Sequence, residues 1–173
     1  MHITLTYVAS VNGKITKGNS PDVHEWSSTE DREHFDKLRD EHEVIVIDRK
    51  TYEAVRPAPE AGKLRIVFTS TPERFKEVSG QLEFVNESPT ELVERLSKEG
   101  FKNVLLAGGA RLSGSFLTAG LVNDIYVNIE PVLFGSGRPM IIGDGLDIAL
   151  KLQSVSQLND QGTLLAHYRV FYN

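Results

Sequence analysis

The chain has 173 residues, 40% of them hydrophobic and 25% charged, which is ordinary for one globular domain with a substantial core. Its net charge is -5 and it has no Lys/Arg-rich run, so nucleic acid is not an expected partner. No export signal starts at Met1, and no apolar run reaches the roughly 18 residues of a membrane span. We therefore expect a cytoplasmic protein without membrane contact. The absence of cysteine excludes disulfides and thiol nucleophiles.

The first half of the chain alternates apolar segments with helix-compatible ones. Residues 3–11 (ITLTYVASV) predict a buried strand that ends at the Asn12-Gly13 turn. A helix with an acidic first turn should follow and end before Val44. The residues able to cap this helix are Ser27, Ser28 and Thr29. Short apolar runs then predict strands at 44–47, 65–69 and 82–85.

In the second half, residues 90–100 predict a helix and residues 103–107 another strand. Strand-like segments follow at 124–134, 150–159 and 163–173, with no helix between the last two, so these two should form an antiparallel hairpin. The alternation of strands and helices predicts an α/β fold over residues 1–173, with three α/β/α layers around a mainly parallel sheet.

Four segments directly follow predicted strands, and in parallel α/β sheets ligands bind beyond the carboxyl ends of the strands. These segments are 9–14 (ASVNGK), 48–53 (DRKTYE), 69–75 (TSTPERF) and 107–117 (AGGARLSGSFL). In the first, Gly13 permits either a close approach to a flat ligand or a plain turn. In the second, Arg49 and Thr51 begin a helix that is either an anion site or an ordinary first turn.

The other two segments are also open to two interpretations. The hydroxyls of Thr69, Ser70 and Thr71 either bind a phosphate or cap a helix that begins near Pro72. Gly108-Gly109 before a helix favours close approach to a pyrophosphate over a tight turn without a ligand. The pattern here differs from the Rossmann glycine motif and lacks the Lys-Ser/Thr pair of a P-loop.

In this order, the motifs resemble the dihydrofolate reductase superfamily. They are most similar to the stand-alone proteins related to the C-terminal reductase domain of the bifunctional riboflavin deaminase-reductase. The resemblance rests on AxSVNGK, the WSSTEDREHFDKL stretch, VIVIDRKTYE, the LLAGGARLSGSFL turn and GLVNDIYVNIEPVLFGSG. It implies a dihydrofolate-reductase-like fold and a nicotinamide cofactor across the carboxyl edge of the sheet. No deaminase zinc signature is present.

The resemblance implies NADPH as the cofactor, because helix starts and paired glycines suit the pyrophosphate and Arg49 suits the 2′-phosphate. It assigns cofactor contacts to Ala9, Arg49, Thr51, Thr69, Ser70, Gly108, Gly109, Ala110, Arg111 and Leu112. The hydride chemistry belongs to the cofactor, and the protein orients it.

The resemblance also implies substrate contacts on the first helix. Asp31 matches the acidic residue that orients and protonates the pteridine in dihydrofolate reductases, with Trp26 and Phe35 as further substrate contacts. Arg39 has the spacing of an Arg that helps bind the ribose phosphate in the riboflavin enzymes. Ordinary alternatives stand beside these roles: a helix N-terminal Asp, a core Phe and a solvated Arg.

Three residues depart from the riboflavin enzymes: Ala107 replaces a Glu, Val55 an Asp and Asp48 a Gly. The leading hypothesis is NADPH-dependent reduction of a pyrimidine or pteridine, resembling 5-amino-6-(5-phosphoribosylamino)uracil reductase. Dihydrofolate reduction is an alternative, and so is a non-catalytic binding or oligomerisation module. Resembling proteins are commonly homodimers, and residues 127–134 (VNIEPVLF) are a candidate interface. The histidines form no metal-binding motif, so we expect no metal.

Overall fold

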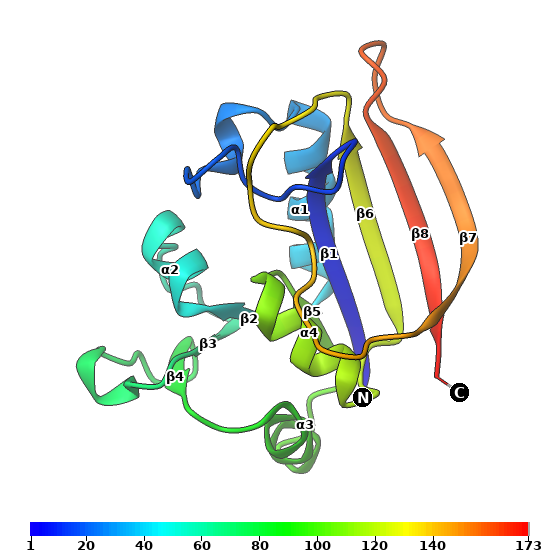
Figure 1. The fold of residues 1–173 in the computed structure, drawn as a ribbon. Helices are drawn as coiled ribbons and strands as arrows, with labels where there is room; N and C mark the ends of the chain where they lie inside the picture. The colour runs from blue at the N-terminus through cyan, green and yellow to red at the C-terminus, as the bar shows by residue number, and fades with distance from the viewer. Residues whose placement is uncertain (173) are drawn as a thin grey trace.

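The computed structural model describes residues 1–172 and contains one eight-stranded sheet with the strand order β4-β3-β2-β5-β1-β6-β8-β7 (Figure 1). The strands are β1 (His2–Ser10), β2 (Val44–Asp48), β3 (Leu64–Phe68), β4 (Leu82–Val85), β5 (Asn103–Leu106), β6 (Asp124–Glu130), β7 (Ala149–Gln157) and β8 (Leu164–Phe171). The α-helices are α1 (Thr29–Glu41), α2 (Arg49–Val55), α3 (Pro89–Lys98) and α4 (Ala110–Thr118). Two short 3₁₀ helices are η1 (Val23–Glu25) and η2 (Pro72–Arg74).

Strands β1 to β6 pair in parallel, whereas β8 pairs antiparallel with both β6 and β7. This confirms the predicted mainly parallel sheet with a C-terminal antiparallel hairpin. The largest difference in a boundary is at β6, because the strand expected over residues 124–134 ends at Glu130. The next residue is Pro131, which has no N–H to donate to a neighbouring strand.

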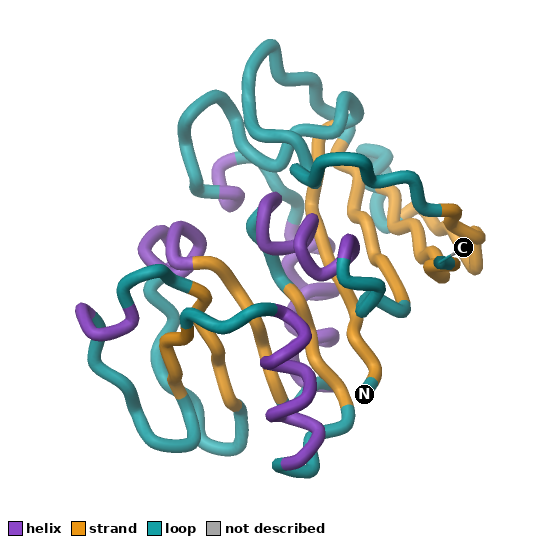
Figure 2. Tube along the Cα trace, turned by 60° about the horizontal axis from the view of Figure 1, so that its bottom comes forward, coloured by secondary structure: helices purple, strands orange, loops and turns teal. Residues whose placement is uncertain are grey.

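The helices cover both faces of the sheet and give the predicted three layers (Figure 2). On one face, α3 and α4 bury Leu92, Leu96 and Phe116 against the apolar side chains of the central strands. On the other face, Tyr52 of α2 packs beside the β2 residues Ile45 and Ile47. Burial of an apolar stripe is the main source of stability for α3 and α4, whereas α2 has no fully buried residue.

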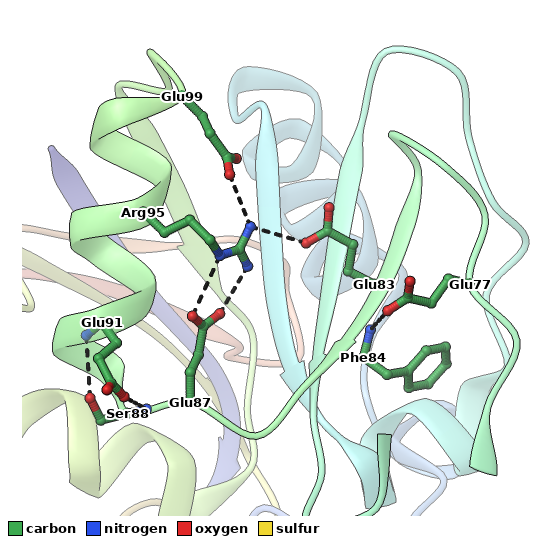
Figure 3. Close-up of polar contacts among 8 residues, drawn as sticks. All are labelled: Glu77, Glu83, Phe84, Glu87, Ser88, Glu91, Arg95 and Glu99. Carbon is green, nitrogen blue, oxygen red and sulfur yellow. Dashed lines mark hydrogen bonds and ion pairs between the residues drawn. The ribbon is translucent and has the colours of Figure 1, made fainter. Parts of the chain in front are cut away.

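Local sequence explains where the two longest helices begin. Ser28 caps α1, because its side chain accepts a hydrogen bond from the Asp31 N–H. Ser88 and Glu91 form a reciprocal capping box at the start of α3 (Figure 3). The helix expected near Pro72 is only the three-residue η2, and the side chain of Thr71 does not cap it. Capping by these hydroxyls was therefore a wrong expectation.

Strand β4 and α3 flank a hollow of about 750 Å³ that is far richer in acidic than in basic groups. Arg95 pairs there with Glu83, Glu87 and Glu99 at 3.2, 2.8 and 3.3 Å (Figure 3). Hydrogen bonding to Glu87 is the main reason why the pKa of Arg95 is raised, so the guanidinium stays charged. None of the residues predicted to form the site lines this hollow.

Candidate functional site

Six parallel strands end at one edge of the sheet, at Ser10, Asp48, Phe68, Val85, Leu106 and Glu130. The predicted cofactor segments follow four of these ends, as the βα connectivity requires. We call this the carboxyl edge.

Asn12 joins two connections beside the carboxyl edge. Its side chain donates a 2.8 Å hydrogen bond to the Phe134 carbonyl and accepts a 3.2 Å bond from the Phe134 N–H. The connection after β1 is thereby fixed to the connection after β6. The Asn12-Gly13 pair thus has a structural role at the edge in addition to making a turn.

The paired glycines lie directly against the start of α2. Gly108 has a φ of 100°, which favours glycine, and its carbonyl accepts a 3.2 Å hydrogen bond from the Asp48 N–H. Thr51 lies on the outer side of this turn, because a Cβ added to Gly108 would be 3.8 Å from its Oγ1. A Cβ at Gly109 would collide with the Asp48 carboxylate, so a larger residue at this position requires Asp48 to move. The structure therefore brings Thr51 and both glycines together.

Arg49, Thr69 and Ser70 lie on the same side of the carboxyl edge but have different surroundings. Arg49 is exposed and forms an ion pair of 2.8 Å with Glu53, one helical turn away. Thr69 is buried, and its Oγ1 accepts a 3.2 Å bond from the Thr71 N–H, whereas Ser70 is exposed. The three residues follow the paired strands β2 and β3, so they face one region of the surface.

Most of the other predicted cofactor contacts are buried residues that pack within the protein. Ala9 and Ala110 are buried, and Leu112 belongs to the apolar core under α4. Arg111 is exposed at the first turn of α4.

Asp31 is buried at the first turn of α1, with 6% of its surface exposed. The Asn128 amide on β6 donates a 2.6 Å hydrogen bond to its Oδ1. Burial raises the pKa of Asp31, and this outweighs the lowering by hydrogen bonds from Asn128 and Ser27, while the Glu130 charge raises it further. The group is therefore held closer to its protonated form than an exposed aspartate.

Glu130 holds the start of α1 against the end of β6. Its Oε1 accepts a 2.8 Å bond from the Ser28 N–H, and its Oε2 accepts a 2.8 Å bond from the Thr163 hydroxyl. Asn159 donates to Thr163 and to Glu30 of α1, each at 3.0 Å. This network joins α1, β6 and the turn between β7 and β8, and it fixes the backbone that carries Asp31.

The three predicted substrate contacts fall in different places. Trp26 packs edge-on against Phe134, with the ring centroids 5.1 Å apart. Phe35 is half-buried, one helical turn after Asp31. Arg39 lies in the last turn of α1, about 12 Å along the helix from Asp31.

Arg39 is also committed to ion pairs, at 2.7 Å to Asp36 and 3.2 Å to Asp40. Because α1 leads to the amino end of β2, the structure does not bring Arg39 to the carboxyl edge.

Sequence reasoning missed Asn128 and Glu130. Their signal was present, because polar residues recur at every second position of β6: Asp124, Tyr126, Asn128 and Glu130. Such alternation in an otherwise apolar strand indicates one polar face. That face lies under α1, where Tyr126 contacts His34 at 5.4 Å.

Residues 1–172 contain neither a candidate membrane span nor a candidate metal cluster. No helix in this range is long and apolar enough to cross a membrane. The same residues contain no group of three or more His, Asp or Glu side chains placed to hold a metal ion.

The sequence matches the RibD C-terminal domain over residues 1–164. The chain belongs to the RibD C-terminal domain family. This membership agrees with the fold and supports a riboflavin-pathway, reductase-like function and hence an oxidoreductase.

Three similar proteins illustrate the range of the family. The uncharacterised protein YwjB of Bacillus subtilis is 27% identical over 172 residues, covering 95% of this chain and 96% of YwjB. The 2,5-diamino-6-ribosylamino-4(3H)-pyrimidinone 5′-phosphate reductase of Methanothermobacter thermautotrophicus is 26% identical, covering 84% of this chain and 86% of the relative. A pyrimidine reductase-like protein from Corynebacterium diphtheriae has the same fold, with a TM-score of 0.81 at 13% identity, covering 99% and 92% of the two chains.

Proposed function

We propose that this protein is an NADPH-dependent reductase of a ribosylaminopyrimidine phosphate, the class of substrate named for the Methanothermobacter relative. The observation that carries the proposal is the position of Asp31. It is a buried carboxyl with a raised pKa, fixed by Asn128 at the same sheet edge as the Gly108-Gly109 turn. Titratable groups with perturbed pKa values cluster at functional sites.

The residues of the turn fit a dinucleotide in shape. Gly108 has no side chain and adopts a backbone conformation that favours glycine, so a pyrophosphate can approach its main chain closely, whereas the Asp48 carboxylate occupies the space beside Gly109. Thr51, Thr69, Ser70 and Arg49 are the further groups that we expect to hold the nucleotide. When bound, NADPH supplies a hydride for transfer to the C=N or ribosyl C=O carbon of the substrate.

Asp31 then has the role of proton donor or orienting group. Reduction of a C=N or C=O bond consumes one hydride and one proton, and the proton goes to the nitrogen or oxygen. A carboxyl with a raised pKa retains a larger protonated fraction near neutral pH, which suits a general acid. Asn128 fixes its Oδ1, while Trp26 and Phe35 supply apolar surface for the heterocycle.

The alternative substrate is dihydrofolate, favoured by the presence of Asp31 and Phe35 on α1 and by Ala107 before the glycines. Steady-state NADPH oxidation with each substrate separates the two. Turnover of the ribosylaminopyrimidine phosphate, at a rate above that with dihydrofolate, supports the proposal. The reverse order supports the alternative. Binding of neither NADPH nor substrate supports a non-catalytic module.

We also propose that the protein is a cytoplasmic homodimer. Of the predicted interface segment 127–134, residues 127–130 are internal, because β6 lies between β1 and β8, and the exposed part is the short stretch 131–134. The edge strand β7 is a better candidate, because all nine of its residues are exposed. Its apolar side chains Leu150, Leu152 and Val155 are between 47% and 58% exposed, and Lys151 is its one charged residue. Exposed edges with so little charge favour pairing with another strand.

A second copy can pair with β7 antiparallel across a two-fold axis. Light scattering tests this arrangement. A dimeric mass that becomes monomeric in Leu152→Lys, but not in a control Gln153→Lys, supports it. A monomeric wild-type protein contradicts it.

A further inference from the structure

The carboxylate of Asp48 occupies the centre of the carboxyl edge. Its Oδ1 accepts a 2.8 Å hydrogen bond from the Thr51 N–H, which caps α2 and fixes the side chain. Its Oδ2 lies against Gly109, where even a single methyl group would collide with it. The Asp48 N–H bonds to the Gly108 carbonyl, so the residue is held to the glycine turn at both main chain and side chain.

No cation neutralises this carboxylate. Among the ion pairs in residues 1–172, none includes Asp48. The adjacent Arg49 is paired with Glu53, so the positive charge of Arg49 is largely balanced by Glu53 and not by Asp48. Asp48 therefore places a negative charge on the surface around the paired glycines.

Asp48 also borders the second group of predicted phosphate contacts. It pairs with Phe68 in the register between β2 and β3, and Thr69 and Ser70 follow Phe68 directly. The carboxylate thus lies between the glycine turn and the Thr69-Ser70 segment. A dinucleotide bound across this edge would have phosphates on both sides of one fixed negative charge.

We propose that Asp48 is a specificity-determining residue that weakens dinucleotide binding and disfavours NADPH more than NADH. This rests on the proposed function, in which the dinucleotide lies across the carboxyl edge. Coulombic repulsion near a protein surface reaches several ångströms and grows with ligand charge. The 2′-phosphate makes NADPH the more negative cofactor, so it bears the larger penalty.

Asp48→Asn is the decisive variant, because Asn caps helices about as well as Asp but lacks the charge. Affinities for NADPH and NADH are measured by fluorescence titration of the wild-type protein and the variant. We expect Asp48→Asn to tighten NADPH about tenfold and NADH about threefold, consistent with loss of one nearby charge. Glu94→Gln, an exposed change on α3, removes the same charge elsewhere and should leave both affinities unchanged.

The outcomes separate this inference from the proposed function. If the wild-type protein binds NADPH and Asp48→Asn binds it equally or more weakly, Asp48 has no such role and the reductase proposal stands. If neither protein binds either nucleotide, the proposed function fails and this inference fails with it. Asp48→Ser, which also caps a helix, replaces Asp48→Asn if circular dichroism shows that the Asn variant is unfolded.

Discussion

The Asn128 side chain donates a 2.6 Å hydrogen bond to the carboxyl of Asp31 across a sequence separation of 97 residues. Both side chains are buried, at 2% and 6% exposure. Burial favours the protonated carboxyl, while the Asn128 bond favours the ionised form, and burial prevails. A carboxyl balanced in this way is suited to giving up a proton during turnover.

Asp31→Asn should stabilise the fold while removing activity. The folded-state pKa of Asp31 is raised, so the unfolded chain releases this proton at a lower pH than the folded chain does. Stability therefore falls as the pH rises from the ordinary pKa of aspartate through the raised value. The variant lacks this penalty, so we expect a higher Tm at neutral pH and a smaller difference in acid.

For the same variant, kcat should fall about 10²- to 10⁴-fold, the usual contribution of a general acid. The exposed Glu33→Gln on α1 is the control and should change neither quantity. A Tm below that of the wild type at neutral pH would contradict the assignment of burial as the dominant influence on Asp31.

Asn128→Leu should shift the pH profile of turnover. The variant removes the donor that lowers the pKa of Asp31 while keeping a similar volume, so the pKa should rise further. If the protonated carboxyl is the active form, the loss of kcat/KM on the alkaline side moves to higher pH. The measurement is kcat/KM across the pH range, and an unmoved alkaline limb would show that Asn128 does not tune Asp31.

Gly109→Ala should destabilise the protein by about 1 to 3 kcal/mol, because the new methyl group meets the Asp48 carboxylate. Urea unfolding measures the change. Gly135→Ala is the matched control, since a Cβ there has no atom within 4 Å. The loss of stability caused by Gly109→Ala should be smaller in a protein that also carries Asp48→Gly. An equal loss in that background would mean that the new methyl group collides with a residue other than Asp48.

Glu130→Ala should lower the free energy of unfolding by about 2 to 3 kcal/mol, because it leaves the Ser28 N–H and the Thr163 hydroxyl without their buried acceptor. A double-mutant cycle with Thr163→Val should give a coupling of about 1 kcal/mol. Strict additivity in that cycle would mean that the Thr163 bond contributes nothing to joining the β7/β8 turn to α1.

The fold was predictable because its determinants are local. Apolar runs of four or five residues identified β2 to β5, and the three candidate caps Ser27, Ser28 and Thr29 before an acidic first turn located the start of α1, where Ser28 is the cap. The boundary of β6 was missed, since the apolar pattern continues past Pro131 although the backbone pairing does not.

The site was only partly predictable because its contacts are long-range. Paired glycines after β5 indicated a close approach, but not that Asp48 fills the space beside Gly109. Asn128 and Glu130 required knowledge of which strand lies under α1. The spacing of Arg39 in the sequence suggested that it lies near the substrate. In the structure it lies at the end of α1, close to the amino ends of the strands and away from the carboxyl edge.

The central claim is tested most directly by following NADPH oxidation by the purified protein with a ribosylaminopyrimidine phosphate as acceptor, for the wild type and for Asp31→Asn. The account predicts substrate-dependent oxidation by the wild type, formation of the ribitylamino product in equal amount, and loss of both in the variant. NADPH oxidation that is absent in the wild type, or that is unchanged in Asp31→Asn, would contradict it.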